Sequence, residues 1–321
     1  MGFACGSAYS SKYVDKIANR YFTLLGDGEV AEGAIWEALN FASHYVLDNM
    51  VALVDVNRLG QSMETILQHQ TEVYHKRFEA FGWHAITVDG HNVTEIIKAL
   101  DVSKTIKGKP TAIIMKTHKG KYFTDLIDNQ LNWHGKCVTP KNTEIIRAEL
   151  LKRMKKPNVK LQTHLPDFKF NWSEPLSSSN FSIQPTYNKT EKVSTRVSYG
   201  NALKKLGDQD KFGHIMGLDA DVKNSTFSEY LEKAHPQKFV NCYIMEQNMV
   251  SVALGASKRN IIPFCSTFAC FFTRAYDQIR IAAISFANIK FFGSHTGLHI
   301  GEDGPSQMGM EVIACLKYFR T

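Results

Sequence analysis

Two stretches of this 321-residue chain decide its fold: YFTLLGDGE at residues 21–29 and VALVDVNRLG at residues 51–60. Each begins with a run of apolar residues and ends in a polar turn, which is the pattern of a buried β-strand followed by a loop. Between them, residues 34–46 place apolar side chains at helical spacing. Strand, helix and strand in this order predict a parallel sheet covered by helices.

The same alternation continues over most of the chain. It predicts further strands at 83–88, 111–115, 215–218, 239–244, 261–266 and 289–294, and further helices at 73–81, 93–100, 199–206, 227–234, 271–283 and 307–319. Residues 2–6 look like the middle of another helix. Prolines and a run of serines break the pattern over residues 157–194, which predicts a linker there. The predicted fold class is therefore α/β, with two tandem doubly wound parallel-sheet domains.

Composition and charge exclude several classes of protein. With 44% hydrophobic and 21% charged residues, the chain is neither a disordered tail, a collagen-like repeat nor a disulfide-rich miniprotein. No apolar run approaches the ~18 residues of a membrane span, so we expect no membrane partner. The net charge of +7 favours anionic ligands such as phosphorylated metabolites, and is too dispersed to predict a nucleic-acid partner. None of the six cysteines has CxxC spacing, which predicts reduced thiols in a cytoplasmic protein.

Residues with oxygen donors end the first two predicted strands. Asp27 lies in the turn after the first strand, and Asn57 follows the second. The carboxyl ends of parallel strands meet at one edge of the sheet, where such folds bind ligands. A carboxylate and an amide carbonyl suit Mg²⁺ or Ca²⁺, and the glycines beside Asp27 let backbone amides approach a phosphate. The alternative is that both segments are ordinary turns, in which Asp and Asn are common.

Several motifs in a fixed order favour the first of these interpretations. Residues 26–29 (GDGE) and 57–62 (NRLGQS) look like the thiamine-diphosphate motif. Further segments resemble the transketolase family, in its animal-type branch: FGWH (81–84), WHGK (133–136), DVKNSTFSE (221–229), EQNMVS (246–251) and GEDGPSQM (301–308). The resemblance covers nearly the whole chain apart from the linker, and it is far more specific than a single GDG.

The resemblance implies a domain organisation. Residues 1–150 would form a diphosphate-binding domain, residues 151–194 a linker and residues 195–321 a pyrimidine-binding domain. Because family members extend further at both ends, the first domain is expected to lack its N-terminal part and the second its C-terminal part. In the family the cofactor lies between the first domain of one subunit and the second domain of its partner, which implies a homodimer.

The resemblance also implies roles for individual residues. Mg²⁺ or Ca²⁺ would be held by Asp27, Asn57 and the backbone carbonyl of Leu59. Thiamine diphosphate would be bound by Gly28, Asn57, Lys119, His134, Glu246, Phe271 and Gln307, with Phe268 beside Phe271. Sugar phosphates would be bound by His134, Arg196, Ser225, His295 and Asp303. Glu246 and His134 would take part in catalysis, and Glu32 would belong to a network of carboxylates that joins the subunits.

The chemistry of the cofactor agrees with the role implied for Glu246. Thiamine catalysis needs a carbanion at C2 of the thiazolium, and a carboxylic acid at N1′ of the aminopyrimidine favours the tautomer that removes the C2 proton. Burial in an apolar pocket would help to keep such a carboxyl protonated. The alternative is that Glu246 only compensates the dipole at a helix N-terminus, where acidic residues are common.

The implied activity is transfer of a two-carbon ketol unit from a ketose phosphate to an aldose phosphate, in the pentose phosphate pathway. One alternative is another thiamine-diphosphate enzyme, such as deoxyxylulose-phosphate synthase, although residues 133–136 and 246–249 argue against it. A second alternative, of a different class, is a catalytically inactive transketolase-like protein that acts by dimerising.

Overall fold

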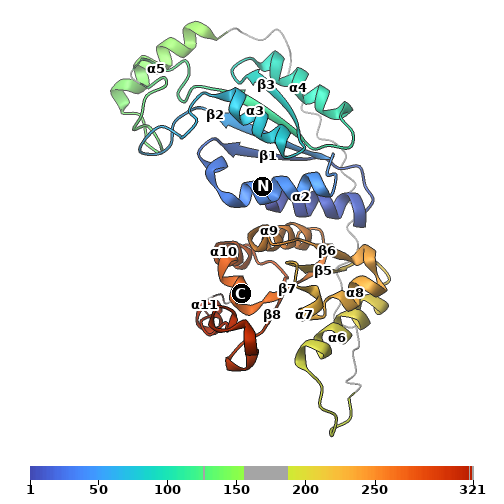
Figure 1. The fold of residues 1–321 in the computed structure, drawn as a ribbon. Coiled ribbons are helices and arrows are strands. Elements are labelled where there is room, and N and C mark those ends of the chain that lie inside the picture. Colours follow the sequence, from blue (N-terminus) through green and yellow to red (C-terminus); the bar gives the residue numbers. More distant parts are fainter. Residues whose placement is uncertain (126, 155–186, 318, 320–321) are drawn as a thin grey trace. The chain divides into compact units, whose positions relative to one another are not determined.

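The computed structural model describes residues 1–125, 127–154, 187–317 and 319 (Figure 1). The predicted linker lies largely outside these residues. The chain divides into two compact units: Met1–Phe22, Gly33–Met50 and Glu174–Thr321 form the first, and Thr23–Glu32 and Val51–Ser173 form the second. No helix of the described part is both long and apolar enough to cross a bilayer.

A sheet of four strands in the order β1-β2-β4-β3 forms the first half of the chain. Its strands are β1 (Tyr21–Gly26), β2 (Met50–Val56), β3 (His84–Asp89) and β4 (Thr111–Lys116). The pairs β2–β4 and β3–β4 are parallel, with Val51 and His84 both opposite Thr111. The helices of this half are α1 (Gly2–Tyr9), α2 (Gly33–His44), α3 (Thr71–Ala80), α4 (Val93–Thr105) and α5 (Pro140–Arg153).

A second four-stranded sheet, in the order β6-β5-β7-β8, forms the other half. Its strands are β5 (Ile215–Asp219), β6 (Phe239–Asn241), β7 (Ile262–Phe268) and β8 (Lys290–Ser294), and all three pairs are parallel. The helices are α6 (Thr195–Gln209), α7 (Lys223–Thr226), α8 (Glu229–Ala234), α9 (Glu246–Ser257), α10 (Tyr276–Ile284) and α11 (Val312–Leu316). Two parallel-sheet α/β regions confirm the predicted fold class.

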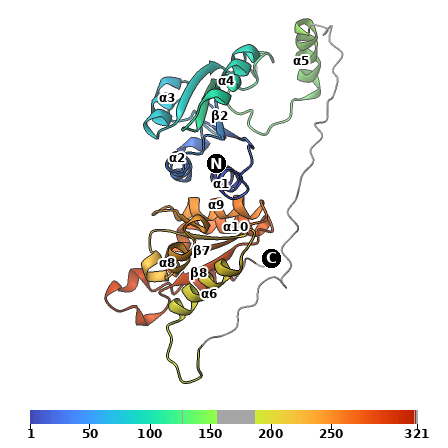
Figure 2. The same cartoon turned by 90° about the vertical axis from the view of Figure 1, so that its right-hand side faces the viewer.

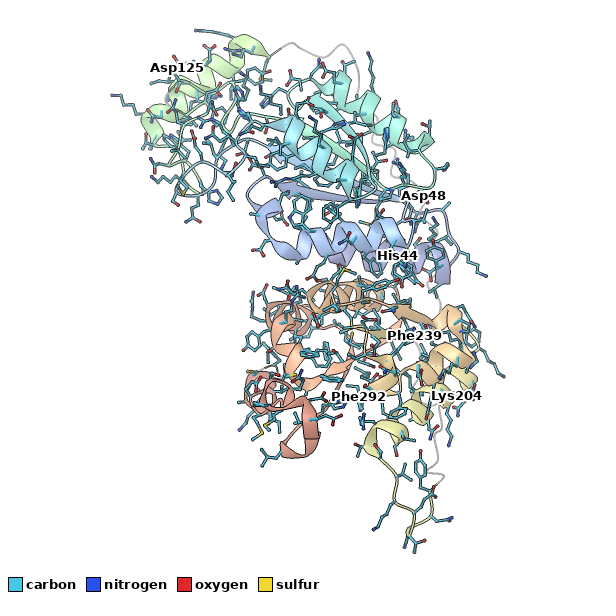
Figure 3. All side chains as sticks on the ribbon, in the orientation of Figure 1. His44, Asp48, Asp125, Lys204, Phe239 and Phe292 are labelled. Carbon is cyan, nitrogen blue, oxygen red and sulfur yellow. The ribbon has the colours of Figure 1, made fainter. Side chains whose placement is uncertain are left out.

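Apolar side chains from strands and helices form the core beside each sheet. Near the second sheet, Leu203, Ile215, Leu231 and Phe239 form one buried cluster. Tyr199 stacks on Phe292 there with ring centroids 3.6 Å apart; Phe239 and Phe292 are labelled in Figure 3. Near the first sheet, the buried cluster consists of Val51, Val88, Ala99 and Ile113. Burial of one such aliphatic or aromatic side chain stabilises the fold by ~1.5–3 kcal/mol.

Helices α1 and α9 belong to the same unit and touch through their backbones (Figure 2). An added Cβ on Gly6 would lie 2.0 Å from the Val252 carbonyl oxygen, and one on Gly255 would lie 2.1 Å from the Phe3 carbonyl oxygen. The Ser7 hydroxyl also donates to the Gly255 carbonyl at 3.2 Å. This contact excludes any side chain at the two glycines. It also fixes α9, the helix that begins at Glu246.

Three predicted elements differ from the structure. The strand expected at 239–244 ends at Asn241, because Tyr243 has a φ of 54° that a strand does not allow. The helix expected at 271–283 is a 3₁₀-helix, Ala269–Ala275, followed by α10. The helix expected at 307–319 is reduced to α11, because Gly309 has a φ of 59° that interrupts helical backbone.

Replacement of Gly6 by Ala should lower the free energy of unfolding by ~1–3 kcal/mol, since the new methyl group forces α1 away from α9. Denaturant titration followed by circular dichroism measures this. Gly33→Ala is the control, because nothing lies within 4 Å of its added Cβ. Equal stability of the two variants would contradict the contact described for α1 and α9.

Candidate cofactor site

Asp27 lies at the edge of the first sheet, directly after β1, and its carboxylate is bound by several donors. Asp27 Oδ1 accepts from the backbone amide of Gly28 at 2.9 Å. Oδ2 accepts from the backbone amide of Arg58 at 2.7 Å and from the Thr65 hydroxyl at 3.1 Å. The side chain is buried, and this burial raises the pKa of Asp27 although the three donors oppose the shift. The carboxylate thus joins the turn after β1 to the turn after β2.

Asn57 is oriented by its neighbours in the turn after β2. Its Nδ2 donates to Asp55 Oδ2 at 2.9 Å, and its Oδ1 accepts from the backbone amide of Leu59 at 3.0 Å. Asp55 also accepts from the Thr117 hydroxyl. Because a carboxylate can only accept, Asp55 fixes which way the Asn57 amide faces. Sequence reasoning did not assign Asp55 this role, although an acidic residue inside an apolar strand could have suggested it.

The Leu59 carbonyl is the third predicted metal ligand, and Lys119 contacts it. Lys119 Nζ donates to the Leu59 carbonyl oxygen at 3.2 Å. A carbonyl oxygen has two lone pairs, so it can accept this bond and still serve as a ligand. The structure therefore brings Asp27, Asn57, Leu59 and Lys119 into one connected group.

The donor chemistry of this group fits a divalent cation of the Mg²⁺ or Ca²⁺ type. The group offers a carboxylate, an amide carbonyl and a backbone carbonyl, which are the hard oxygen ligands that these ions prefer. Nowhere among the described residues do three or more His, Cys, Asp or Glu side chains cluster as metal ligands. Asp27 is the one carboxylate in this group of three ligands. Such a site suits an ion whose remaining ligands include the oxygens of a bound anion such as a diphosphate.

His134 is not joined to this group. It is exposed, in a turn where Gly135 has a φ of 67°. Among the described residues, no hydrogen bond joins His134 to Asp27, Asn57 or Lys119.

Glu246 begins helix α9 in the other unit and is 4% exposed. Its Oε2 forms an ion pair with an Nη of Arg274 at 3.0 Å. The same guanidinium pairs with Glu37 of α2, which raises the pKa of Arg274, and Glu37 Oε2 accepts from the backbone amide of Asn248 at 3.0 Å. A cation and a second carboxylate therefore hold the position of Glu246. Glu37 is thus the carboxylate that the first half of the chain contributes to this network. Glu32 is exposed; the resemblance had implied a carboxylate network between subunits for it.

Sequence reasoning missed Glu37 and Arg274. Glu37 lies on the buried face of α2 with Ile35, Ala38 and Leu39. An acidic residue at an apolar position of an amphipathic helix was the signal that could have identified it. Arg274 follows the run of aromatic residues after β7 and gave no comparable signal.

Aromatic rings gather after β7, close to the end of β8. Phe268 stacks on Phe271 with ring centroids 5.3 Å apart, and on His295 at 3.9 Å. Phe271 is half-buried, so one part of its ring is accessible. Gln307 lies in the short helix Pro305–Gln307, which contacts the 3₁₀-helix that contains Phe271.

The predicted sugar-phosphate residues lie close together. Arg196 donates to the backbone carbonyl of Ser225 at 2.9 Å, and the same Nη lies 3.4 Å from His295 Nε2. Burial and the Arg196 charge lower the pKa of His295, while Asp303 opposes the shift. Arg196, Ser225, His295 and Asp303 thus form one cluster, in which the neutral form of His295 is favoured.

Asp219 is a further buried acid that sequence reasoning missed. It ends β5 and is fully buried. Its oxygens accept from the Val222 amide at 2.7 Å and from the hydroxyls of Thr226 and Ser228, both at 2.8 Å. Burial raises the pKa of Asp219 to about 6, although these donors oppose the shift. Asp219 therefore holds the turn that contains Ser225.

Comparison with known protein families identifies both halves. The model described as "Transketolase, thiamine diphosphate binding domain" matches residues 4–163, and "Transketolase, pyrimidine binding domain" matches residues 191–319. The fold and these matches define a thiamine-diphosphate-binding α/β protein. The chain belongs to the transketolase family, which confirms the predicted resemblance.

Individual relatives agree with this assignment. Human transketolase is 51% identical over 318 residues, covering 99% of this chain and 50% of the human protein. Mouse transketolase-like protein 2 is 48% identical with the same coverage. The chain thus spans about half the length of the curated relatives it matches. The crystal structure of Campylobacter jejuni transketolase matches with a TM-score of 0.78 over 98% of this chain and 54% of that chain, and at 23% identity it shows the fold.

Replacement of Asp219 by Asn should change how stability depends on pH. The raised pKa means that the folded state binds the Asp219 proton more tightly than the unfolded chain does. Its contribution to the free energy of unfolding is therefore complete below about pH 4. This contribution, up to ~3 kcal/mol, is lost as the pH rises from about 4 through about 6. The variant lacks this titration, so its stability relative to the wild type should improve with rising pH. Denaturant titrations at several pH values measure the difference, and parallel curves for the two proteins would contradict it.

Proposed function

We propose that this protein transfers a two-carbon ketol unit from a ketose phosphate to an aldose phosphate, with thiamine diphosphate and Mg²⁺ or Ca²⁺ as cofactors. The observation that supports this most directly is the connected oxygen group of Asp27, Asn57 and Leu59 at the ends of β1 and β2. Lineage adds support, since human transketolase is 51% identical over 318 residues. By the same lineage, we place the reaction in the pentose phosphate pathway and the protein in the cytoplasm.

The residues of the first half would bind the metal and the diphosphate. Asp27, Asn57 and the Leu59 carbonyl would hold the metal ion. Gly28 and the Lys119 ammonium would lie beside the anion, with His134 joining the site from its exposed turn. Burial of Asp27 favours this role, because a cation beside a buried carboxylate offsets the cost of removing that charge from water.

The residues of the second half would bind the aminopyrimidine and the substrate. When bound, thiamine diphosphate supplies the nucleophilic carbon for the reaction. Glu246 would hold a proton at N1′ of the pyrimidine, and Arg274 and Glu37 would keep its carboxyl group in place. The accessible part of Phe271 would contact the ring, with Gln307 nearby. Arg196, Ser225, His295 and Asp303 would orient the sugar phosphate, since a guanidinium and a hydroxyl are good phosphate donors.

The proposal includes a homodimer in which each cofactor lies between the diphosphate domain of one subunit and the pyrimidine domain of the other. The domain boundaries would be 1–150 and 195–321, joined by a linker. A second candidate function is a catalytically inactive, dimerising protein. The presence of transketolase-like proteins among the relatives, such as one from mouse at 48% identity, is consistent with it.

Asp27→Ala should weaken Mg²⁺-dependent binding of thiamine diphosphate by more than about tenfold, because even partners outside the first ligand shell of a metal contribute 10–100-fold. Calorimetry with and without MgCl₂ measures this. Asp125→Ala is the control, since it removes an exposed carboxylate of the same unit, which is labelled in Figure 3. Equal affinity of both variants would exclude Asp27 as a ligand, and a wild type that does not bind would exclude the proposed cofactor.

Glu246→Gln should retain cofactor binding within a few-fold but lower ketol transfer by ~10²–10⁴-fold, since the amide cannot exchange a proton with the pyrimidine. Product analysis with a ketose phosphate donor and an aldose phosphate acceptor measures the rate. A wild type that binds the cofactor without turnover would support the second candidate function.

A further inference from the structure

A cavity of about 490 Å³ lies beside the carboxyl ends of β3 and β4 and has no part in the function proposed above. Its lining includes His91 and His118. His118 stacks on His69 with ring centroids 5.1 Å apart, and its ring centroid lies 6.1 Å from that of His91. We call His69, His91 and His118 the histidine cluster.

The histidine cluster holds the segment Thr117–Lys119, whose last residue contacts the Leu59 carbonyl. His69 Nε2 lies 2.8 Å from the Thr117 carbonyl oxygen, which can only accept, so this nitrogen is the donor. The backbone amide of His118 donates to His91 Nε2 at 2.8 Å. A backbone amide can only donate, so His91 Nε2 has no proton and the ring is in its neutral form with the proton on Nδ1.

The turn that contains His91 lies directly against this segment. The Gly90 amide donates to the Lys116 carbonyl at 2.9 Å. An added Cβ on Gly90 would lie 2.3 Å from Thr117 Cγ2, so only glycine allows this approach. The turn therefore brings His91 within hydrogen-bonding distance of the residue that precedes Lys119.

We propose that His91 is a positioning residue for the metal and diphosphate site: its neutral ring accepts the His118 amide and thereby keeps Lys119 on the Leu59 carbonyl. The inference rests on the proposed function, because it needs Lys119 and Leu59 in the cofactor site. Protonation of Nε2 replaces the acceptor with a second N–H donor, which breaks the bond to the His118 amide. Acid then releases the segment, and cofactor affinity falls.

Charged groups of both signs surround His91. On its own turn and on α4 lie the carboxylates of Asp89 and Glu95. From the end of β4 and the following loop come Lys116, His118 and Lys121, together with Tyr122. Asp128 lies 3.9 Å from His118 Nδ1. Burial, followed by the charge of Lys121 and the neighbouring His69 ring, lowers the pKa of His118, so the neutral form of His118 is favoured.

The test compares His91→Gln and His91→Leu with the wild type. Gln offers an uncharged oxygen near the position of Nε2, whereas Leu offers no acceptor. His84→Gln is the matched control, because His84 begins β3 at the opposite end of the strand. Calorimetry with MgCl₂ and thiamine diphosphate is done at about pH 7.5 and about pH 5.5, the range in which histidine changes charge. Hydrogen exchange of the His118 amide is measured in the same samples without cofactor.

At the higher pH, His91→Leu should bind about five- to tenfold more weakly than the wild type, while His91→Gln stays within a few-fold. On acidification, the wild type and His84→Gln should lose more affinity than His91→Gln. The His118 amide should exchange faster in His91→Leu, and faster in the wild type at low pH. Equal pH dependence of the wild type and His91→Gln would overturn the inference, as would unchanged exchange in His91→Leu. If the wild type binds no cofactor, the proposed function fails, and the exchange data alone decide whether His91 holds the segment.

Discussion

Burial of carboxylates at the ends of parallel strands is the constraint on which both half-sites depend. Removing an ionised carboxylate from water costs several kcal/mol unless donors or cations replace the lost hydration. Asp27 after β1 accepts from the amides of Gly28 and Arg58 and from the Thr65 hydroxyl. Asp219 at the end of β5 accepts from an amide and two hydroxyls of the segment that follows it. Glu246 meets the same requirement with a guanidinium. Arg58 and Thr65, which bind Asp27, and Arg274, which binds Glu246, belong to other turns or helices, so charge compensation there also fixes the local geometry.

The two half-sites differ in how they hold their polar groups. Around Asn57, orientation comes from hydrogen bonds with Asp55 and Leu59, two residues away on either side. Around Glu246, orientation comes from an ion pair whose cation is shared with Glu37. In the proposed function, the first arrangement would present oxygen donors to a cation. The second keeps a carboxyl group buried where a neutral heterocycle could meet it, beside accessible aromatic surface on Phe271.

Much of this organisation could be predicted from the sequence, because strand and helix periodicity are local properties. The strands that end at Asp27 and Asn57, and the placement of Arg196 near His295, agree with the expectations drawn from apolar runs and motifs. The partners of those residues could not be predicted so easily. Glu37 and Asn248 are 211 positions apart, and no periodicity links them. The predicted ends of helices and strands were wrong where a single residue with positive φ, such as Tyr243 or Gly309, interrupts the regular backbone.

The backbone contact between α1 and α9 has a consequence for synthesis of the chain. Ser7 and Gly255 are 248 positions apart, so α1 meets α9 only after the residues between them have been made. Long-range contacts of this kind slow folding, because the entropy of closing the intervening loop is lost before the contact forms. Until then α1 can contact α2, but the glycine-containing face that packs against α9 stays uncovered. Before α9 is made, this face of α1 is therefore apolar backbone surface that a chaperone could shield.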